Sequence, residues 1–234
     1  EWKSQQGCSV AYSHMAATVY NNRAYVIGGL DKQVGIECQV YTSENNSWLF
    51  EFPSLPKGRF NSVCFVYRDS LYVFGGTDNS SNMNEIVRYD LSTQNSGEWT
   101  TIAKVNEANQ RGGVAFVVED KVYAGLGEKS NGIRNGFYVS SDSLTKWELI
   151  PSIPAQLGVI SSGVYDEQKK SFFMIDNDGK IWEYNLTTEQ WTSRSLWIRM
   201  KNYHMFMLDG SIYILGQDIY QKNKFTVYNP IWDN

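Results

Sequence analysis

The stretch Ser70-Leu-Tyr-Val-Phe-Gly-Gly76, followed by a tryptophan at Trp99, decides the fold of this chain. An earlier copy reads Arg23-Ala-Tyr-Val-Ile-Gly-Gly29 and leads to Trp48. A weaker copy spans Lys121 to Gly127 and precedes Trp147. Two degenerate copies end at Asp176-Asn177 before Trp191 and at Gly216-Gln217 before Trp232. The pattern therefore repeats with a period of roughly 40 to 50 residues, and such a period built from short strands is typical of a β-propeller whose repeats are blades.

Each repeat reads as four strands. The first strand is rich in small residues, as in Met15-Ala-Ala-Thr-Val19, which suits an innermost position. A turn such as Asn21-Asn22 follows, with residues that two-residue hairpin turns prefer. The second strand ends at glycine, which tolerates a positive φ or the close approach of a neighbouring blade. A third strand with a tyrosine, such as Tyr41, then leads to the Trp that opens the outer strand.

The spacing of the repeats predicts five four-stranded blades in one all-β domain over residues 1–234. The expected blades are approximately 7–53, 54–104, 105–151, 152–196 and 197–234 plus 1–6. Trp2 and Trp232 hold equivalent places, so residues 1–6 are expected to supply the outer strand of the last blade. Pairing of the N- and C-terminal strands would close the ring and remove its exposed edges. A six-bladed ring completed by a further segment is the alternative.

The glycine pair, the tyrosine and the tryptophan of these repeats resemble the kelch repeat of β-propellers, and the resemblance covers essentially the whole chain. The segment Ser140-Ser-Asp-Ser-Leu-Thr-Lys-Trp147 is similar to the Asp-box turn of secreted propellers, although it lacks the usual glycine. These resemblances imply a kelch-like propeller, closer to bacterial secreted or cell-surface propellers than to cytoplasmic ubiquitin-ligase adaptors.

Composition narrows the functional class. The net charge of −4 at pH 7 disfavours nucleic-acid binding, which needs a basic face to neutralise phosphates. No apolar run reaches the length of about 20 residues that a membrane-spanning helix needs. The chain begins at Glu1 rather than Met, which suggests a trimmed or mature fragment. Cys8, Cys38 and Cys64 follow no metal-ligand spacing, so their redox state is left open.

Function is expected on the face that carries the longer connections, because propeller loops bear the binding residues. Three arginines precede innermost strands there, namely Arg59, Arg111 and Arg199. They could hold a carboxylate or an acidic sugar through bidentate hydrogen bonds. Alternatively, they pair with the backbone of a neighbouring blade or with the acidic residues Asp31, Asp78 and Glu128. Trp197 and Tyr220 are candidates either for stacking on a sugar or for packing between blades.

A copper site is the one metal hypothesis that the sequence raises. Tyr203-His204 resembles the adjacent Tyr-His ligand pair of galactose oxidase, and His14 is the other histidine of the chain. Such a site needs a further Tyr and a second converging His, for which no matching motif is recognised. We therefore expect structural histidines, no metal and no cofactor.

Other catalytic machinery is not recognisable in the sequence. It contains no phosphate-binding glycine loop, zinc spacing, nucleophile elbow or sialidase arginine motif. We expect a monomeric, non-catalytic binding module, with a glycan or a protein as ligand and no nucleic acid as partner. An extracellular, periplasmic or cell-surface location is expected, with the cytoplasm as the alternative. A carbohydrate-active or copper-dependent enzyme and a structural spacer within a longer chain are the competing hypotheses.

Overall fold

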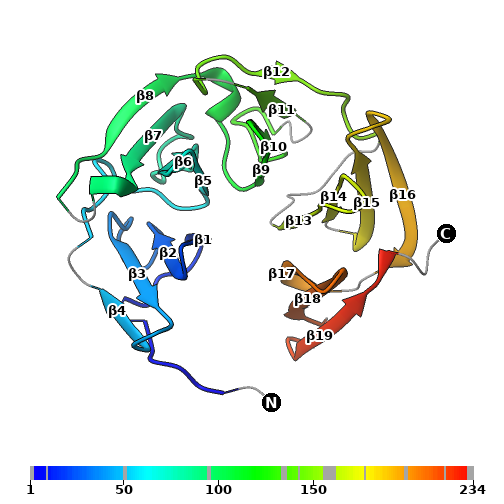
Figure 1. The fold of residues 1–234 in the computed structure, drawn as a ribbon, viewed down its shortest axis with the longest axis horizontal. Coiled ribbons are helices and arrows are strands. Elements are labelled where there is room, and N and C mark those ends of the chain that lie inside the picture. The colour runs from blue at the N-terminus through cyan, green and yellow to red at the C-terminus, as the bar shows by residue number, and fades with distance from the viewer. Residues whose placement is uncertain are drawn as a thin grey trace. The chain divides into compact units, whose positions relative to one another are not determined.

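The structure is a computed structural model that describes residues 3–8, 10–49, 52–93, 96–132, 136–141, 143–154, 162–176, 178–197, 200–218 and 220–230. In these residues the named elements are β-strands apart from two 3-10 helices, η1 (Leu91–Thr93) and η2 (Asn106–Ala108). The strands form five sheets (Figure 1). The predicted all-β fold with five sheets is confirmed.

The chain forms two compact units. The first comprises Glu1–Arg111, Val117–Val122 and Ser140–Trp147, and the second comprises Gly112–Phe116, Tyr123–Val139 and Glu148–Asn234. The five predicted blade segments each contain one sheet, except that the last strand of the fourth sheet extends to Trp197. A single domain over residues 1–234 stays a prediction.

Two sheets belong wholly to the first unit. The first has the order β1-β2-β3-β4, with strands β1 (Ala16–Tyr20), β2 (Arg23–Ile27), β3 (Cys38–Thr42) and β4 (Ser47–Leu49). The second has the order β5-β6-β7-β8, with strands β5 (Val63–Tyr67), β6 (Ser70–Phe74), β7 (Glu85–Asp90) and β8 (Thr100–Lys104). Alternating side chains of the two sheets share one core, which includes Ile27, Val40, Leu71, Val73 and Tyr89. Residues two apart in a strand, such as Leu71 and Val73, lie on the same face, so one face of each sheet is buried against the other.

The third sheet has residues in both units and the order β12-β11-β10-β9. Its strands are β9 (Val114–Val118), β10 (Lys121–Gly125), β11 (Phe137–Ser140) and β12 (Glu148–Leu149).

The second unit contains the last two sheets. The fourth has the order β13-β14-β15-β16, with strands β13 (Gly163–Asp166), β14 (Ser171–Ile175), β15 (Lys180–Asn185) and β16 (Gln190–Trp197). The fifth has the order β17-β18-β19, with strands β17 (Lys201–Leu208), β18 (Ser211–Gln217) and β19 (Asn223–Tyr228). β13 lies beside β17 (Figure 1), and a core of Phe173, Ile175, Ile212 and Ile214 joins the two sheets.

The tight turns between first and second strands follow from their residues. Asn21 and Asn22 have φ values of 46° and 57°, and Arg68 and Asp69 have values of 47° and 54°. Two consecutive residues with positive φ define the turn whose twist matches that of a β-hairpin. The turn residues therefore set the register of β1 on β2 and of β5 on β6.

The glycine just after the second strand has a positive φ and also lies where a neighbouring backbone leaves no room for a Cβ. Gly28 has a φ of 64°, and a Cβ there would lie 2.3 Å from the carbonyl oxygen of Arg59. Gly75 has the same φ, and its Cβ would lie 2.6 Å from the carbonyl oxygens of Ala108 and Gln110. The segment entering the next sheet thus passes directly over each glycine.

In the second and fourth sheets, the repeat tryptophan bonds to the segment that precedes the sheet. The Trp99 indole donates to the carbonyl of Pro53 at 2.9 Å, and the Trp191 indole donates to that of Pro151 at 2.6 Å. Trp147 differs, because its indole donates to Leu144 within its own turn at 2.9 Å. The tryptophans therefore contribute a directed hydrogen bond as well as apolar area.

The expected fourth strand of the last sheet, from residues 1–6, is not found among the described residues. That sheet has three strands, and residues 3–8 lie in no strand. The Gln6 N–H donates to Asn46 Oδ1 at 2.9 Å, and its carbonyl accepts the Trp48 indole at 3.0 Å. The backbone of Gln6 is thus bonded to the first sheet.

Candidate interaction site

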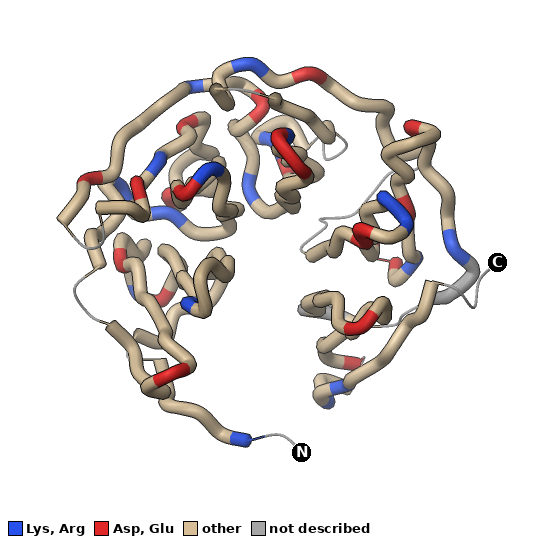
Figure 2. The backbone as a smooth tube through the Cα atoms, in the orientation of Figure 1, with Lys and Arg blue, Asp and Glu red and all other residues tan. Residues whose placement is uncertain are grey.

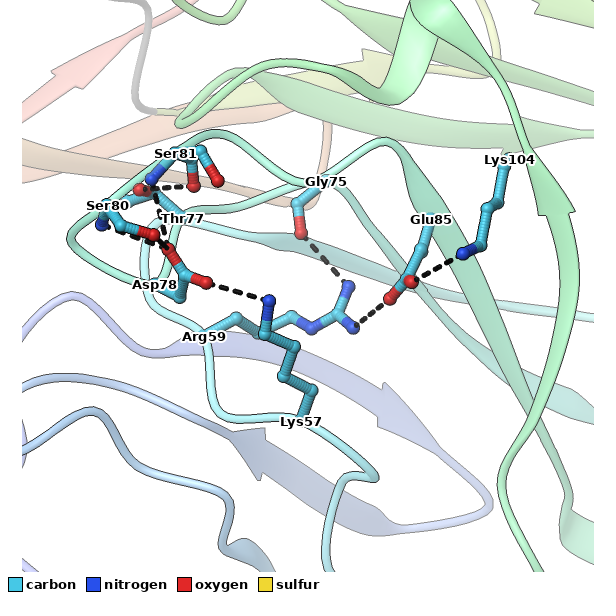
Figure 3. A network of polar contacts seen from close by, with 9 residues as sticks. All are labelled: Lys57, Arg59, Gly75, Thr77, Asp78, Ser80, Ser81, Glu85 and Lys104. Atoms are coloured by element: carbon cyan, nitrogen blue, oxygen red, sulfur yellow. Dashed lines mark hydrogen bonds and ion pairs between the residues drawn. The ribbon is translucent and has the colours of Figure 1, made fainter.

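A group of polar contacts lies at one end of the second sheet, where β6 ends and β7 begins. Five charged side chains lie there in two groups of ion pairs (Figure 3): Lys57 with Asp78, and Arg59 and Lys104 with Glu85. We call these five residues the polar network. Lys57 and Arg59 lie in the connection that precedes β5. Asp78 lies in the loop between β6 and β7, Glu85 is the first residue of β7, and Lys104 is the last residue of β8.

Arg59 forms the buried part of the polar network. Its side chain has 0% exposure, and it donates to the Gly75 carbonyl at 3.2 Å and to Glu85 Oε2 at 3.5 Å. Burial lowers the pKa of the guanidinium, and the charge of Glu85 opposes that shift. The Arg59 carbonyl also accepts the N–H of Gly29 at 2.9 Å. Arg59 therefore joins the two sheets of the first unit and does not reach solvent.

Asp78 holds the loop between β6 and β7 in a fixed shape. Its Oδ1 accepts the Ser80 N–H at 3.0 Å, the Ser80 hydroxyl at 2.6 Å and the Ser81 N–H at 3.0 Å. Its Oδ2 lies 2.8 Å from the Lys57 ammonium. The Lys57 contact, followed by the bonds from Ser80 and Ser81, holds the pKa of the Asp78 carboxyl well below its usual range. The loop is thus ordered by a carboxylate that stays ionised.

Further bonds anchor this loop to the sheet. The Thr77 hydroxyl donates to the Ser81 carbonyl at 2.9 Å, and the Met83 N–H donates to the Gly76 carbonyl at 2.8 Å. Met83 is buried, whereas Asn79, Ser80 and Ser81 are exposed. The loop therefore presents an exposed polar tip on a buried base.

The remaining predicted binding residues have varied positions. Asp31 and Arg111 are exposed, Glu128 is half-buried, and Tyr220 is 75% exposed in the turn after Asp218. Arg111 and Glu128 each have an interaction partner. Trp197 ends β16, where its backbone pairs with Lys180. Arg199 lies outside the described residues. Of the candidates, Arg59 and Asp78 both lie at this end of the second sheet, each in an ion pair of its own, and a ligand-binding role for the set stays a prediction.

Tyr203 and His14, two residues of the copper hypothesis, make hydrogen bonds within the protein. The Tyr203 hydroxyl donates to the Ile175 carbonyl and is buried, whereas the adjacent His204 is exposed. Neighbours on a strand face opposite sides, so the two side chains diverge. The His14 imidazole bonds to the Ser13 hydroxyl at 2.9 Å. No group of three or more His, Cys, Asp or Glu side chains in the described part of the chain is arranged to hold a metal ion.

Sequence reasoning missed Lys57, Glu85 and Lys104 as members of a site. Glu85 opens the third strand of its repeat and Lys104 closes the fourth, which places both at the long-loop end once the four-strand reading is made. That placement was the available signal.

Within the described residues, no helix has the length and apolar character needed to cross a membrane.

Comparisons with known proteins agree with this architecture. The KLHDC2/KLHL20/DRC7 Kelch-repeats domain matches residues 3–166. The solved structure described as "Structure of YjhT" superposes with a TM-score of 0.81 at 15% identity, covering 98% of this chain and 88% of the other. The fold is therefore a β-propeller, and the chain belongs to the kelch-repeat family.

Curated relatives extend the comparison. Kelch-like protein 36 of Mus musculus is 27% identical over 165 residues, which cover 65% of this chain and 26% of that protein. Kelch repeat and BTB domain-containing protein 1 of Ectromelia virus (strain Moscow) is 25% identical over 227 residues, covering 92% of this chain and 39% of the relative. The chain thus spans well under half the length of these two relatives.

Proposed function

We propose that this chain is a non-catalytic protein-binding module whose contact surface includes the loop between β6 and β7. The carrying observation is that Asp78 fixes this loop through bonds from Ser80, Ser81 and Lys57, while its tip stays exposed. A loop ordered before binding loses less conformational entropy when a partner docks. This arrangement supports recognition of a macromolecular surface.

The kelch family supports the same role, because kelch propellers are typically interaction modules. The name of the Ectromelia virus relative joins kelch repeats to a BTB domain. Because of this similarity, we propose that the present chain acts as the kelch part of a larger protein. A glycan ligand, an extracellular or cell-surface location and a monomeric state stay predictions.

The test is affinity capture with immobilised protein, followed by quantitative mass spectrometry of the retained proteins. Asn79→Gly and Ser81→Arg change the exposed tip, and Asn79 has a φ of 77° that glycine accepts. Asn22→Gly is the matched control, because Asn22 is an exposed asparagine with a φ of 57° in the turn at the opposite end of the first sheet. We expect the tip variants to lose specific partners that wild type and Asn22→Gly retain. Equal capture by all variants would contradict a contact through this loop.

A further inference from the structure

The outer strand of the third sheet is the shortest outer strand among the described residues. β12 has two residues, whereas β4, β8 and β16 have three, five and eight. It pairs with β11 through Tyr138 with Leu149 and Val139 with Glu148, and the Ile150 N–H adds one bond to β11 at 3.0 Å. Both residues of β12 are exposed. Few interstrand hydrogen bonds therefore hold β12 to its sheet.

β12 is continuous with a segment that has two apolar anchors. We call residues 143–149 the strap, which runs along the outside of the third sheet and carries the charged residues Lys146 and Glu148 (Figure 2). The side chain of Leu144 is 1% exposed, and the half-buried Trp147 packs its ring against that of Phe74, with centroids 5.2 Å apart. The other five side chains of the strap are exposed. Attachment of the strap thus depends on Leu144 and Trp147.

The anchor at Leu144 is strained, and the hydrogen bond beside it is internal to the strap. Leu144 has a φ of 58°, in the left-handed region where the Cβ of a leucine crowds the backbone. The Trp147 indole donates to the Leu144 carbonyl at 2.9 Å, so both partners of this bond belong to the strap. By contrast, the Trp99 indole donates to Pro53, in the segment that precedes its sheet. Detachment of the strap therefore relieves the strain and keeps the Trp147 bond.

We infer that the strap detaches from the rest of the protein as one unit while β6, β11 and β14 stay folded. Local units of this kind open with a free energy below that of global unfolding, and few buried apolar contacts mark them. Release uncovers the part of the Phe74 ring that Trp147 contacts and frees the strand edge of β11. The strap is thus a conformational device that changes the surface of the protein, and it goes beyond the proposed contact through the loop between β6 and β7.

The test is hydrogen–deuterium exchange of the full chain, followed by mass spectrometry, at urea concentrations below the unfolding transition. We expect the backbone amides of residues 148–150 to exchange at least about 100-fold faster than those of the buried strands β6 and β14. Their exchange rate should hardly change with urea, because a local opening exposes little surface. Exchange in β6 and β14 should accelerate with urea, because global unfolding exposes far more surface.

Two leucines of the strap give a matched pair of variants. Leu144 is 1% exposed and Leu149 is 62% exposed. Leu144→Ala keeps the backbone strain but removes the buried anchor, so the exchange of residues 148–150 should accelerate at least about 30-fold. Leu149→Ala should change that exchange less than about threefold. Thermal unfolding verifies that both variants are folded.

Three results would overturn the inference. Exchange of residues 148–150 as slow as that of β6, with the same steep urea dependence, would mean that the strap opens only in global unfolding. Exchange at the rate of an unfolded peptide would mean that the strap is not closed in the native protein. Equal acceleration in the two leucine variants would mean that Leu144 does not anchor the strap. Capture of partners through the loop tip is measured separately, so the proposed function stands or falls independently of these results.

Discussion

The guanidinium of Arg59 donates to the carbonyl oxygen of Gly75 at 3.2 Å, across 16 residues of sequence. The bond ties the connection that enters the second sheet to the glycine pair that ends the second strand of that sheet. Its other donor contacts Glu85, which Lys104 also contacts, so one buried side chain links three segments of the first unit.

Replacement of Arg59 by methionine tests this structural role. Arg59→Met keeps an apolar stem but removes the donor to the Gly75 carbonyl and leaves Glu85 with Lys104 alone, and we expect a loss of about 2–4 kcal/mol in unfolding free energy. Urea denaturation measures it. Arg68→Met is the control, because the Arg68 side chain is 55% exposed, and its effect should stay within about 0.5 kcal/mol. Equal urea midpoints for the two variants would contradict the assigned role.

A second prediction separates backbone strain from steric conflict at the glycines. Gly28→Ala and Gly210→Ala share a positive φ, at 64° and 70°, but only the Cβ at residue 28 meets backbone, 2.3 Å from the Arg59 oxygen. Gly210→Ala should cost about 1 kcal/mol from conformation alone. Gly28→Ala should cost at least about 2 kcal/mol more, because the Arg59 backbone must move. Thermal or urea unfolding of the pair measures the difference.

The third prediction concerns pH. The folded-state pKa of Asp78 is lowered chiefly by Lys57, so its ionised form is favoured in the folded protein. The stability that Asp78 contributes is therefore fully present above the unfolded-state pKa of about 3.9, and it is lost as pH falls through the lower folded-state value. The difference in unfolding midpoint between wild type and Asp78→Asn should be constant from neutral pH to about pH 5 and should shrink below about pH 4. A difference that grows on acidification would reverse the assigned sign.

A fourth prediction uses the tryptophan bonds. Trp99→Phe keeps an aromatic ring beside Tyr89, whose ring centroid lies 5.4 Å away, but removes the indole donor to Pro53. We expect a loss of about 1 kcal/mol from the unpaired carbonyl in addition to the cost of the smaller ring. Double-mutant analysis with Tyr89→Leu separates the hydrogen bond from the ring packing. If the Trp99→Phe and Tyr89→Leu effects on unfolding free energy add completely, and Trp99→Phe alone causes no loss, the result would argue against the bond to Pro53.

The cysteines give a fifth prediction. Cys8 is exposed, while Cys38 and Cys64 are buried free thiols, and burial raises the pKa of Cys38 to about 12. A thiol-reactive dye should therefore label one of the three cysteines rapidly in the native protein and all three after unfolding. Cys8→Ser should abolish the rapid phase. Rapid labelling of a second thiol would show that the core shared by the first two sheets, which contains Cys38 and Cys64, opens readily.

The sequence by itself determined the repeated unit and its local conformations. Asn21 and Asn22 adopt the positive φ of a hairpin turn, and Gly28 and Gly75 also have positive φ. The spacing of the tryptophans marks the length of each repeat. These preferences act over a few residues, because they arise from φ/ψ sterics and from hydrogen bonds between near neighbours. The prediction of five sheets from such signals was therefore correct.

The tertiary structure decided what the charged side chains do. Nothing local to Gly58-Arg59-Phe60 indicates whether the guanidinium faces solvent or Glu85, which lies 26 residues further along the chain. Likewise, the exposure of Lys57 and Lys104 depends on how the loop with Asp78 and the end of β8 come together. Ion pairing and burial depend on long-range packing, so the sequence could place Arg59 and Asp78 in long connections but could not show which side chains they contact.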